Sequence, residues 1–333
     1  MKQDIVLTGD RPTGKLHIGH YVGSLRKRLE LQETYDRPYI MIADMQALTD
    51  HAHNPSLVKE SVLAVTRDYL ACGLTFEKNR IFIQSLVPEL TEFTVLYMNF
   101  VTLARLLRNP TVKSEMNQKE YGNTVPSGFL NYPISQAADI TAFNATLVPV
   151  GDDQLPMIEQ TNEIVRHINH HFNTDVLVEC KALLSTVTRL PGIDGSAKMS
   201  KSLGNCIYLS DDADTVRKKV MSMFTDPGHL RVEDPGKVEG NPVFTYLDAF
   251  DTDKEGLAEW KEHYQRGGLG DVKVKRRLET CLQAELEPIR ERREAIAQND
   301  EELMQILKNN SEEARKIASE NLQKLKAVLG INY

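Results

Sequence analysis

TGDRPTGKLHIGHY occupies residues 8–21 and follows directly on the short apolar run at residues 5–7. Its glycines and proline predict a turn in which the backbone can approach a ligand closely. The segment after the turn begins a helix, whose free N–H groups and positive dipole end favour a phosphate. His17 and His20 are three residues apart and therefore share one face of that opening turn. There they can donate hydrogen bonds to phosphate oxygens. A surface loop with incidental histidines, or a histidine pair lacking a third metal ligand, remain alternative interpretations of the pattern alone.

The first half of the chain alternates short branched or aromatic runs with amphipathic stretches. We expect strands at residues 4–9, 39–42, 81–83 and 147–150, and helices at residues 22–33, 57–70 and 155–172. Strand–helix–strand repetition of this kind predicts parallel βαβ units and hence an open α/β sheet.

From about Ala213 onward the strand signals fade. Helical patterns rich in alternating charge occupy residues 215–224, 257–266, 274–297, 301–308 and 311–329. We therefore predict an α/β protein with a Rossmann-like parallel-sheet catalytic domain and a mostly helical C-terminal domain. The first domain is expected at residues 1–206, with a helical insertion at about 86–130, and the second at residues 207–333.

Composition excludes several classes of protein. The chain has 333 residues and a formal net charge of -7, which argues against indiscriminate nucleic-acid binding but leaves room for a local basic face. Its four cysteines lie far apart, without metal-type or redox-type spacing, as expected of ordinary thiols in a reducing cytosol. The N-terminus carries no apolar run long enough for a signal peptide or a membrane span. A cytoplasmic protein without membrane contact is the expectation.

A second motif, GIDGSAKMSKSLG, occupies residues 192–204. Its small, polar, glycine-flanked composition suits a loop that closes over a substrate. Lys198 and Lys201 can neutralise a pyrophosphate leaving group, with Ser200 and Ser202 as hydrogen-bond donors. A solvated loop with two lysines is the alternative.

A third group of polar residues lies on the segment YPISQAAD at residues 132–139, which predicts a helix start with a proline in its first turn. Tyr132, Gln136 and Asp139 are spaced four and three residues apart, so they share one helix face. A carboxylate on this otherwise apolar helix needs a hydrogen-bond partner if it is buried. An indole N–H or a phenolic hydroxyl would supply one, and a structural polar cluster is the alternative.

Downstream, Gly151, Asp152, Asp153 and Gln154 follow the apolar run at residues 147–150. They are expected at the carboxyl end of a strand, where open α/β sheets bind ligands. Asp153 can accept hydrogen bonds from ribose hydroxyls, and Gln154 can meet the polar backbone groups of an amino acid.

The strings HIGH at residues 17–20 and KMSKS at residues 198–202 resemble the two signatures of class I aminoacyl-tRNA synthetases. The two strings follow in the order of that class, the first in its strand–turn–helix setting and the second near the end of the nucleotide-binding domain. The block VPVGDDQ at residues 148–154 is similar to the tryptophan-type branch, and the resemblance extends over nearly the whole chain. It implies that L-tryptophan is activated with ATP and Mg²⁺ to tryptophanyl-adenylate and is then transferred to the 3′-terminal adenosine of tRNA(Trp).

The resemblance also implies roles for individual residues. The expected catalytic residues are His17, His20, Lys198 and Lys201. The expected ATP-binding residues are Arg11, Gly19, His20, Gly151, Asp152, Asp153, Leu190, Lys198, Met199, Ser200, Lys201 and Ser202. The expected amino-acid-binding residues are Leu7, Gln46, Tyr132, Gln136, Asp139 and Gln154.

The closely related tyrosine enzymes are the main alternative, because Tyr132, Gln136 and Asp139 also fit their pattern. Many bacterial tryptophan enzymes carry methionine at the position of Gln136, which counts against tryptophan. Leu7 counts for it, because tyrosine enzymes place at that position a tyrosine that binds the substrate hydroxyl. Gln46 stands where many bacterial relatives have histidine. A non-catalytic, synthetase-like RNA-binding protein is the alternative of another class.

The expected partners are tRNA(Trp), L-tryptophan and ATP, with the helical second domain binding the anticodon. The resemblance further implies a homodimer, for which the apolar residues of segment 85–107 can supply the interface, although core packing explains them equally well. No DNA binding and no permanently bound metal are expected. His167, His170 and His171 lack a nearby cysteine or carboxylate arrangement and are expected at an exposed helix end.

Overall fold

The computed structural model describes residues 4–119, 121–122, 124–184, 189–196, 199–201 and 203–333. Its strands are parallel. β1 (Leu7–Asp10), β2 (Tyr39–Ile42) and β3 (Arg80–Ile83) pair in the order β1-β2-β3, and β4 (Leu147–Val150) pairs with β5 (Lys181–Leu184). A parallel bridge between Val6 and Leu147 brings the two sets together, so that β1 lies between β2 and β4. The predicted open α/β sheet is confirmed. From β1, the strands β2 and β3 follow on one side, and β4 and β5 follow on the other side.

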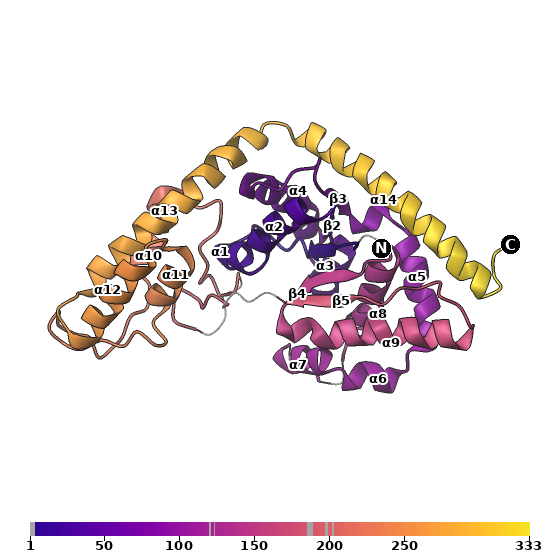
Figure 1. The fold of residues 1–333 in the computed structure, drawn as a ribbon, viewed down its shortest axis with the longest axis horizontal. Coiled ribbons are helices and arrows are strands. Elements are labelled where there is room, and N and C mark those ends of the chain that lie inside the picture. The colour runs from indigo at the N-terminus through magenta and orange to yellow at the C-terminus, as the bar shows by residue number, and fades with distance from the viewer. Residues whose placement is uncertain (1–3, 120, 123, 185–188, 197–198, 202) are drawn as a thin grey trace.

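Helices cover this sheet on both faces (Figure 1). In the first part of the chain they are α1 (Ile18–His20), α2 (Arg26–Thr34), α3 (Asp44–His51), α4 (Pro55–Cys72), α5 (Glu89–Tyr97), α6 (Leu103–Arg108), α7 (Pro110–Gln118), α8 (Ser127–Thr141) and α9 (Leu155–His171). A five-residue π-helical segment, η1 (Tyr21–Leu25), joins α1 to α2, and short 3₁₀ turns occupy η2 (Gln84–Leu86), η3 (Met98–Phe100) and η4 (Asp152–Gln154). Because helices cover both faces, the central run of β2 is continuously apolar, and every residue of β2 is buried.

The second part of the chain is helical, as predicted. It consists of α10 (Ala213–Met221), α11 (Pro242–Phe250), α12 (Lys254–Arg266), α13 (Asp271–Ile296) and α14 (Asp300–Val328). The first three and the beginning of α13 form a helical lobe at one side of the molecule (Figure 1). Helix α11 and strand β5 were not predicted. No helix in the described part of the chain is both long and apolar enough to cross a bilayer.

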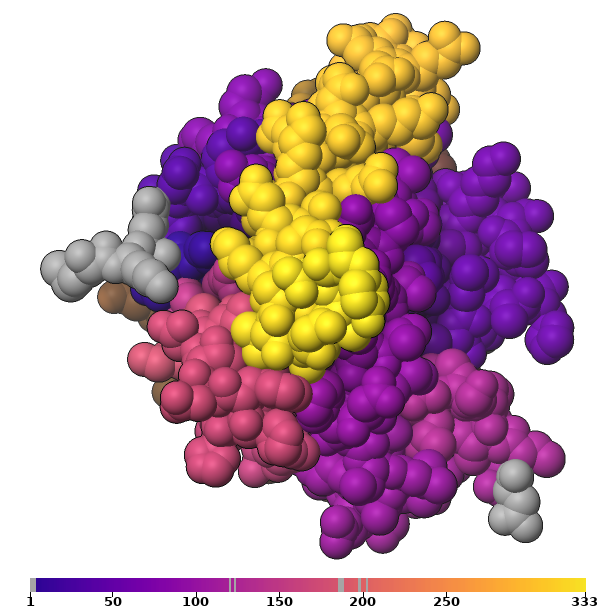
Figure 2. Space-filling view, turned by 90° about the vertical axis from the view of Figure 1, so that its right-hand side faces the viewer, coloured from indigo at the N-terminus to yellow at the C-terminus, as the bar shows by residue number. Residues whose placement is uncertain are grey.

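The last helix differs from the expectation. The patterns at 301–308 and 311–329 form one helix, so the predicted break is wrong. Asn310 and Ser311 stay helical because their side chains hydrogen-bond to strand β3. Asn310 Nδ2 donates to Ile81 O at 3.3 Å, and Ser311 Oγ accepts from Ile83 N at 3.0 Å. Helix α14 thus packs on β3 and α5, and Figure 2 shows it lying across the first part of the chain. The domain boundary at 206/207 stays a prediction. The chain after this boundary includes α14, which packs on elements that lie before it.

Helix α8 also begins earlier than expected. It starts at Ser127, so Tyr132 lies inside it and Pro133 is an internal residue, not part of the first turn. Pro133 costs the helix one backbone hydrogen bond. The expected common face survives this correction, since the period of an α-helix is the same at its start and in its interior.

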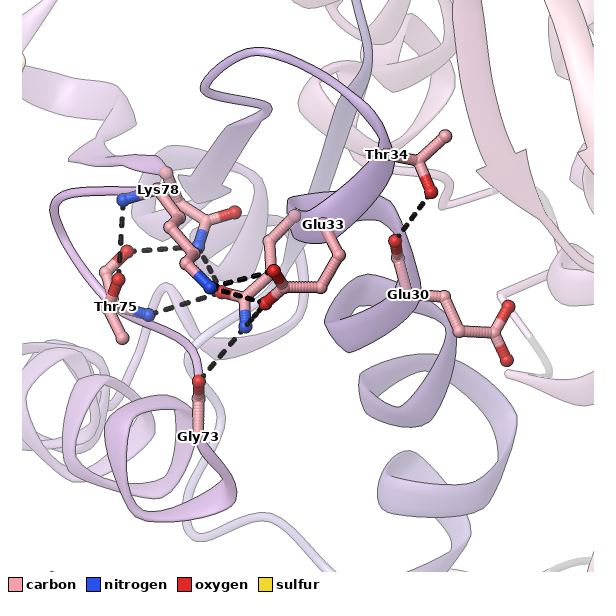
Figure 3. A network of polar contacts seen from close by, with 8 residues as sticks. Glu30, Glu33, Thr34, Gly73, Thr75 and Lys78 are labelled. Atoms are coloured by element: carbon pink, nitrogen blue, oxygen red, sulfur yellow. Dashed lines mark hydrogen bonds and ion pairs between the residues drawn. The ribbon is translucent and has the colours of Figure 1, made fainter.

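A polar network fixes α2 against the end of α4 (Figure 3). Gln32 donates to Gly73 O at 3.1 Å and accepts from Asn79 Nδ2 at 2.8 Å, and the second of these bonds is buried. Beside it, Lys78 Nζ contacts both carboxylate oxygens of Glu33 at 2.6 and 2.7 Å. Gly73 ends α4 at a φ of 109°, a conformation that favours glycine. The network holds α2, the helix that follows the glycine-rich turn, at a fixed distance from α4.

Candidate functional site

A cavity of about 450 Å³ opens at the carboxyl ends of β1, β2 and β4. It lies where β1 separates β2 from β4, which is the position at which open α/β sheets bind ligands. It is lined by Leu7, Thr8, Gly9, Asp10, Arg11, Thr13, His20, Ser24, Arg28, Met41, Ala43, Gln46, Glu115, Tyr132, Gln136, Asp139, Ile140, Val148, Pro149, Val150, Gly151 and Gln154. One end of the cavity is formed by the glycine-rich turn and the other by helix α8.

The two histidines of the turn form a reciprocal cap. His17 is the N-cap of α1, and its Nδ1 accepts from Gly19 N at 3.1 Å. His20 Nδ1 accepts from the backbone N–H of His17 at 3.2 Å. Their ring centroids are 3.8 Å apart. Because each Nδ1 atom is an acceptor, each neutral ring carries its proton on Nε2, which is the atom left to donate to a ligand.

Burial keeps both rings neutral. It lowers the pKa of His17 to about 2, with the neighbouring His20 and Lys201 acting in the same direction. It lowers the pKa of His20 to about 4, although the Asp10 carboxylate opposes the shift. Near neutral pH the pair therefore offers two N–H donors without positive charge. His20 lines the cavity, whereas His17 lies buried behind it.

Gly19 is required by the closeness of its neighbours. A Cβ atom there would lie 2.9 Å from the His17 ring and 3.2 Å from Met199 Sδ. Met199 and Leu190 are buried in the apolar core next to Ile18, so the structure places both behind the turn and not in the wall of the cavity. Of these two residues, Met199 packs directly against Gly19 of the turn.

Lys201 links the second motif to the first. Its Nζ donates to Gly14 O at 3.0 Å and to Thr13 O at 3.3 Å. Burial lowers the pKa of Lys201, and the carboxylates of Asp10 and Asp68 oppose that shift. Ser200 lies next to it, its backbone N–H donating to Asn205 Oδ1 at 2.7 Å. Lys198 and Ser202, also expected in the site, lie outside the described residues.

A buried ionic cluster under the turn was not predicted. Arg28 is 2% exposed and donates to Asp10 Oδ2 at 2.7 Å and to Gly9 O at 3.2 Å. Tyr69 donates to the same Asp10 oxygen at 2.6 Å. Burial raises the pKa of Asp10, but the charges of Arg28 and His20 together with these hydrogen bonds hold it below its ordinary value. Asp10 stays ionised at the end of β1, where it faces the cavity.

The far end of the cavity is built around Asp139. This carboxylate is 2% exposed and accepts from Gln84 Nε2, which lies 2.9 Å from each of its oxygens. Burial raises the pKa of Asp139 to about 7, against the lowering by Gln84 and Gln46. Gln46, from α3, also donates to Ser135 Oγ at 2.8 Å. Gln84 was missed because it comes from η2, far away in the sequence.

Three further residues expected at the amino acid line this end of the cavity. Leu7 on β1 is 4% exposed and gives it an apolar wall. Tyr132 and Gln136 face the cavity from α8, on the face that also carries Asp139. The Tyr132 hydroxyl is buried, and the Glu115 carboxylate is its polar neighbour. Burial and the neighbouring Glu115 carboxylate raise the pKa of Tyr132, so the phenol stays protonated.

The segment after β4 reaches the cavity only in part. Gly151 and Gln154 line it, whereas Asp152 and Asp153 are exposed beside it. The backbone of Asp153 is anchored by Thr111 Oγ1, which donates to its carbonyl at 2.7 Å, and its carboxylate faces Arg189 at 3.6 Å. Asp153 therefore stands at the mouth of the cavity.

Arg11 also lines the cavity, but its guanidinium is paired. Its Nη1 donates to Asp50 Oδ2 at 2.8 Å, and Lys119 contacts the other oxygen of the same carboxylate. This trio joins the turn after β1 to the ends of α3 and α7. In the described residues, no group of three or more histidine, cysteine or acidic side chains is arranged to hold a metal ion.

Comparison with known proteins agrees with this arrangement. Residues 2–287 match the family of class I tRNA synthetases for tryptophan and tyrosine (W and Y). The chain is 59% identical to a tryptophan–tRNA ligase of Clostridium longisporum, covering 100% of this chain and 98% of the relative. It is also 59% identical to the tryptophan–tRNA ligase of Streptococcus mutans, covering 100% of both chains. A crystal structure of tryptophanyl-tRNA synthetase from Campylobacter jejuni, complexed with ADP and tryptophan, has a TM-score of 0.84, 29% identity, and coverage of 98% and 99% of the two chains.

Proposed function

This chain belongs to the class I tRNA synthetases of the tryptophan and tyrosine type, among the tryptophan–tRNA ligases, and from that premise we propose how its cavity performs the reaction. The observation that carries the proposal is one continuous cavity with a phosphate-type turn at one end and the buried carboxylate of Asp139 at the other. An amino acid bound at Asp139 would direct its carboxylate toward an ATP molecule held by the turn. The fold thus brings both substrates of amino-acid activation together.

The first step joins the two substrates. A carboxylate oxygen of L-tryptophan attacks the α-phosphorus of ATP in line, and the bond to the β-phosphate oxygen breaks. Pyrophosphate leaves, and tryptophanyl-adenylate remains in the cavity. Mg²⁺ enters with ATP as part of the substrate. The protein supplies position and charge stabilisation and no covalent nucleophile.

The histidines and Lys201 act on the phosphates. The Nε2–H groups of His17 and His20 are the donors that the capping geometry leaves available. Donors that are fixed before the reaction stabilise charge as it develops on the phosphate oxygens. Lys201 Nζ, which in this structure donates to two carbonyl groups of the turn, donates to pyrophosphate oxygens when ATP is bound. Lys198 is assigned the same task from the KMSKS motif.

The specificity for tryptophan comes from the far end. Asp139 accepts the indole N–H, while the apolar Leu7 side chain leaves a substrate hydroxyl without a partner. This is the argument against tyrosine, because an unpaired buried hydroxyl costs binding free energy. Tyr132 and Gln154 orient the ammonium group, and the buried Tyr132 hydroxyl has a free acceptor site for it. Gln46 and Gln136 complete the wall.

The ATP ribose and adenine are assigned to the segment after β4 and to the turn. Gly151 lets the nucleotide approach the backbone, since it has no side chain, and Asp153 at the cavity mouth accepts from ribose hydroxyls. Asp152 neighbours them. Arg11 reaches the phosphates after leaving Asp50. Met199 packs against Gly19, whose lack of a side chain leaves space for adenine, and Leu190 belongs to the same apolar core.

In the second step the 2′-hydroxyl of the terminal adenosine of tRNA(Trp) attacks the carbonyl carbon of the adenylate, and AMP leaves. We assign the anticodon to the helical lobe. We also propose that two copies associate in the cytoplasm as a homodimer. Four apolar side chains of segment 85–107 support this, since Val95, Met98, Leu103 and Leu107 are exposed by 55%, 40%, 59% and 43%. Sedimentation of the purified protein distinguishes the monomer from the dimer.

Amino-acid-dependent ATP–pyrophosphate exchange tests the reaction directly. The purified protein is compared with tryptophan, tyrosine and phenylalanine, with His20→Ala as the control. Exchange with tryptophan alone, lost in the control, is the expected result. Exchange with tyrosine would overturn the assignment of Leu7 and Asp139. A folded protein that catalyses no exchange would favour a synthetase-like RNA-binding protein without catalytic activity.

A further inference from the structure

A buried carboxylate behind the glycine-rich turn has two partners from distant parts of the chain. Asp68, on α4, is fully buried. Its Oδ2 accepts from Leu16 N at 2.9 Å, and its Oδ1 accepts from Arg293 Nε, on α13, at 2.6 Å. Asp68 does not line the cavity and has no place in the reaction described above.

We propose that Asp68 is a positioning residue for the turn that binds ATP and that Arg293 of α13 holds its carboxylate in place. The inference rests on the proposed function of that turn. Leu16 immediately precedes His17, the N-cap of α1. The hydrogen bond from Leu16 N therefore fixes the backbone just before the histidine pair. The carbonyl of Leu16 is also fixed, since it accepts from Leu209 N at 3.0 Å.

The neighbour of Asp68 on the same helix holds the other end of the turn. Tyr69 donates to Asp10 Oδ2 at 2.6 Å, at the point where β1 ends. Consecutive residues of α4 therefore anchor the turn where it leaves the strand and where it enters α1. Between these two anchors, among the described residues, the only side chain that donates to carbonyl groups of the turn is Lys201.

Helix α13 fixes α4 and the turn from outside. It runs from the helical lobe toward the start of α14 (Figure 1) and packs on α4. Next to Arg293, Arg292 Nε donates to Ala71 O at 2.6 Å. Earlier on α13, Glu285 Oε1 accepts from the Tyr21 hydroxyl at 2.6 Å. Tyr21 is the residue that follows His20. The Asp68–Arg293 pair is thus one of several contacts through which α13 sets the place of the ATP turn.

The charge of Asp68 also acts on the lysine above the turn. Burial raises the pKa of Asp68, whereas the hydrogen bonds from Leu16 and Arg293 lower it. The Asp68 carboxylate in turn raises the pKa of Lys201 against the lowering by burial. Replacing Asp68 should therefore disturb both the histidine pair and Lys201, and leave the tryptophan end of the cavity unchanged.

The test measures ATP–pyrophosphate exchange in the full chain with Asp68→Ala, Asp68→Asn and Arg293→Met. Arg67→Met is the matched control, because Arg67 forms an ion pair between the same helix α4 and Asp300 on α14. We expect Asp68→Ala to lower kcat by about tenfold or more, with the KM for tryptophan unchanged, since small displacements of positioned groups are costly to rate. Asp68→Asn retains an acceptor for Leu16 N but loses the charge and the acceptor for Arg293, so it should lower kcat less than Asp68→Ala does. Arg67→Met should match the wild type.

Folded Asp68→Ala with an unchanged kcat, or with a change in the KM for tryptophan alone, would overturn the proposal. A residue needed only for stability would lower the melting temperature and leave the kcat of the folded enzyme unaltered. If Asp68→Ala does not fold, the comparison of Arg293→Met with Arg67→Met decides: equal kcat values contradict the role of Asp68. Absence of exchange in the wild type would instead contradict the proposed function itself.

Discussion

Gln84 clamps Asp139: the side-chain amide of Gln84 lies 2.9 Å from each oxygen of the Asp139 carboxylate, a residue only 2% exposed. The clamp fixes the plane of the carboxylate and leaves its remaining lone pairs for a ligand. Burial nevertheless raises the pKa of Asp139 to about 7. The residue proposed to bind the indole therefore changes its charge within the physiological pH range.

Tryptophan affinity should depend on that charge. The ionised carboxylate accepts the indole N–H better than the neutral acid, so binding should tighten by up to about tenfold between pH 6 and pH 8. Calorimetric titration of the protein with tryptophan measures this dependence. The Asp139→Asn variant should bind tryptophan weakly, and its affinity should not depend on pH. A wild-type affinity that is equally strong at both pH values would contradict the assignment.

The free energy of unfolding should also depend on the ionisation of Asp139. It should fall as the pH rises, whereas the affinity for tryptophan should increase. The pKa of Asp139 is raised in the folded protein, so the folded state binds more protons than the unfolded state between about pH 4 and pH 7. The contribution of Asp139 to stability is full below that range and is lost as pH rises to 7. Asp139→Asn should therefore gain about 2.5 kcal/mol relative to the wild type between pH 5 and pH 8, at about 1.4 kcal/mol for each unit of pH up to the folded pKa. Urea unfolding measures it, with the exposed Asp153→Asn as a control that shows no such gain.

Much of this arrangement is predictable from local sequence. Branched apolar runs such as residues 39–42 form strands because both faces of the sheet are covered, and the turn at residues 8–21 carries its own glycines and histidines. Contacts between distant residues are not predictable in this way. Gln84 lies 55 residues from Asp139, and Lys201 lies 187 residues from Gly14. Helix α14 crosses the expected break at Asn310 because strand β3 uses that side chain.

Gly19→Ala should disable the ATP step while leaving tryptophan binding intact. The added Cβ would lie 2.9 Å from the His17 ring, so the ring must move away from its capping position. We expect the exchange rate to fall by about a hundredfold. Gly23→Ala is the matched control on the following helical segment, because its Cβ would meet no atom within 4 Å. Equal rates for the two variants would show that the position of the His17 ring does not matter.

The ion pair of Arg11 should compete with ATP. Arg11 donates to Asp50 at 2.8 Å, with the two side chains 47% and 20% exposed. If Arg11 reaches the phosphates, Arg11→Met should raise the KM for ATP by about tenfold, whereas Asp50→Asn frees the guanidinium and should lower that KM. Glu33→Gln, which removes the exposed ion pair with Lys78, serves as the control for a general charge effect. Arg11→Met with an unchanged KM for ATP would exclude the contact.

Ser311→Ala should destabilise the fold through strand β3. The Ser311 hydroxyl is buried, donates to Leu307 O at 2.7 Å and accepts from Ile83 N at 3.0 Å. Alanine leaves that strand N–H without its partner under α14, at a cost of about 1–2 kcal/mol in the free energy of unfolding. Ser61→Ala is the matched control, since the buried Ser61 hydroxyl makes the same bond one turn back, to Leu57 O. Urea unfolding of both variants measures the difference. Equal losses would mean that the bond to Ile83 contributes nothing and that apolar packing alone holds α14 on the sheet.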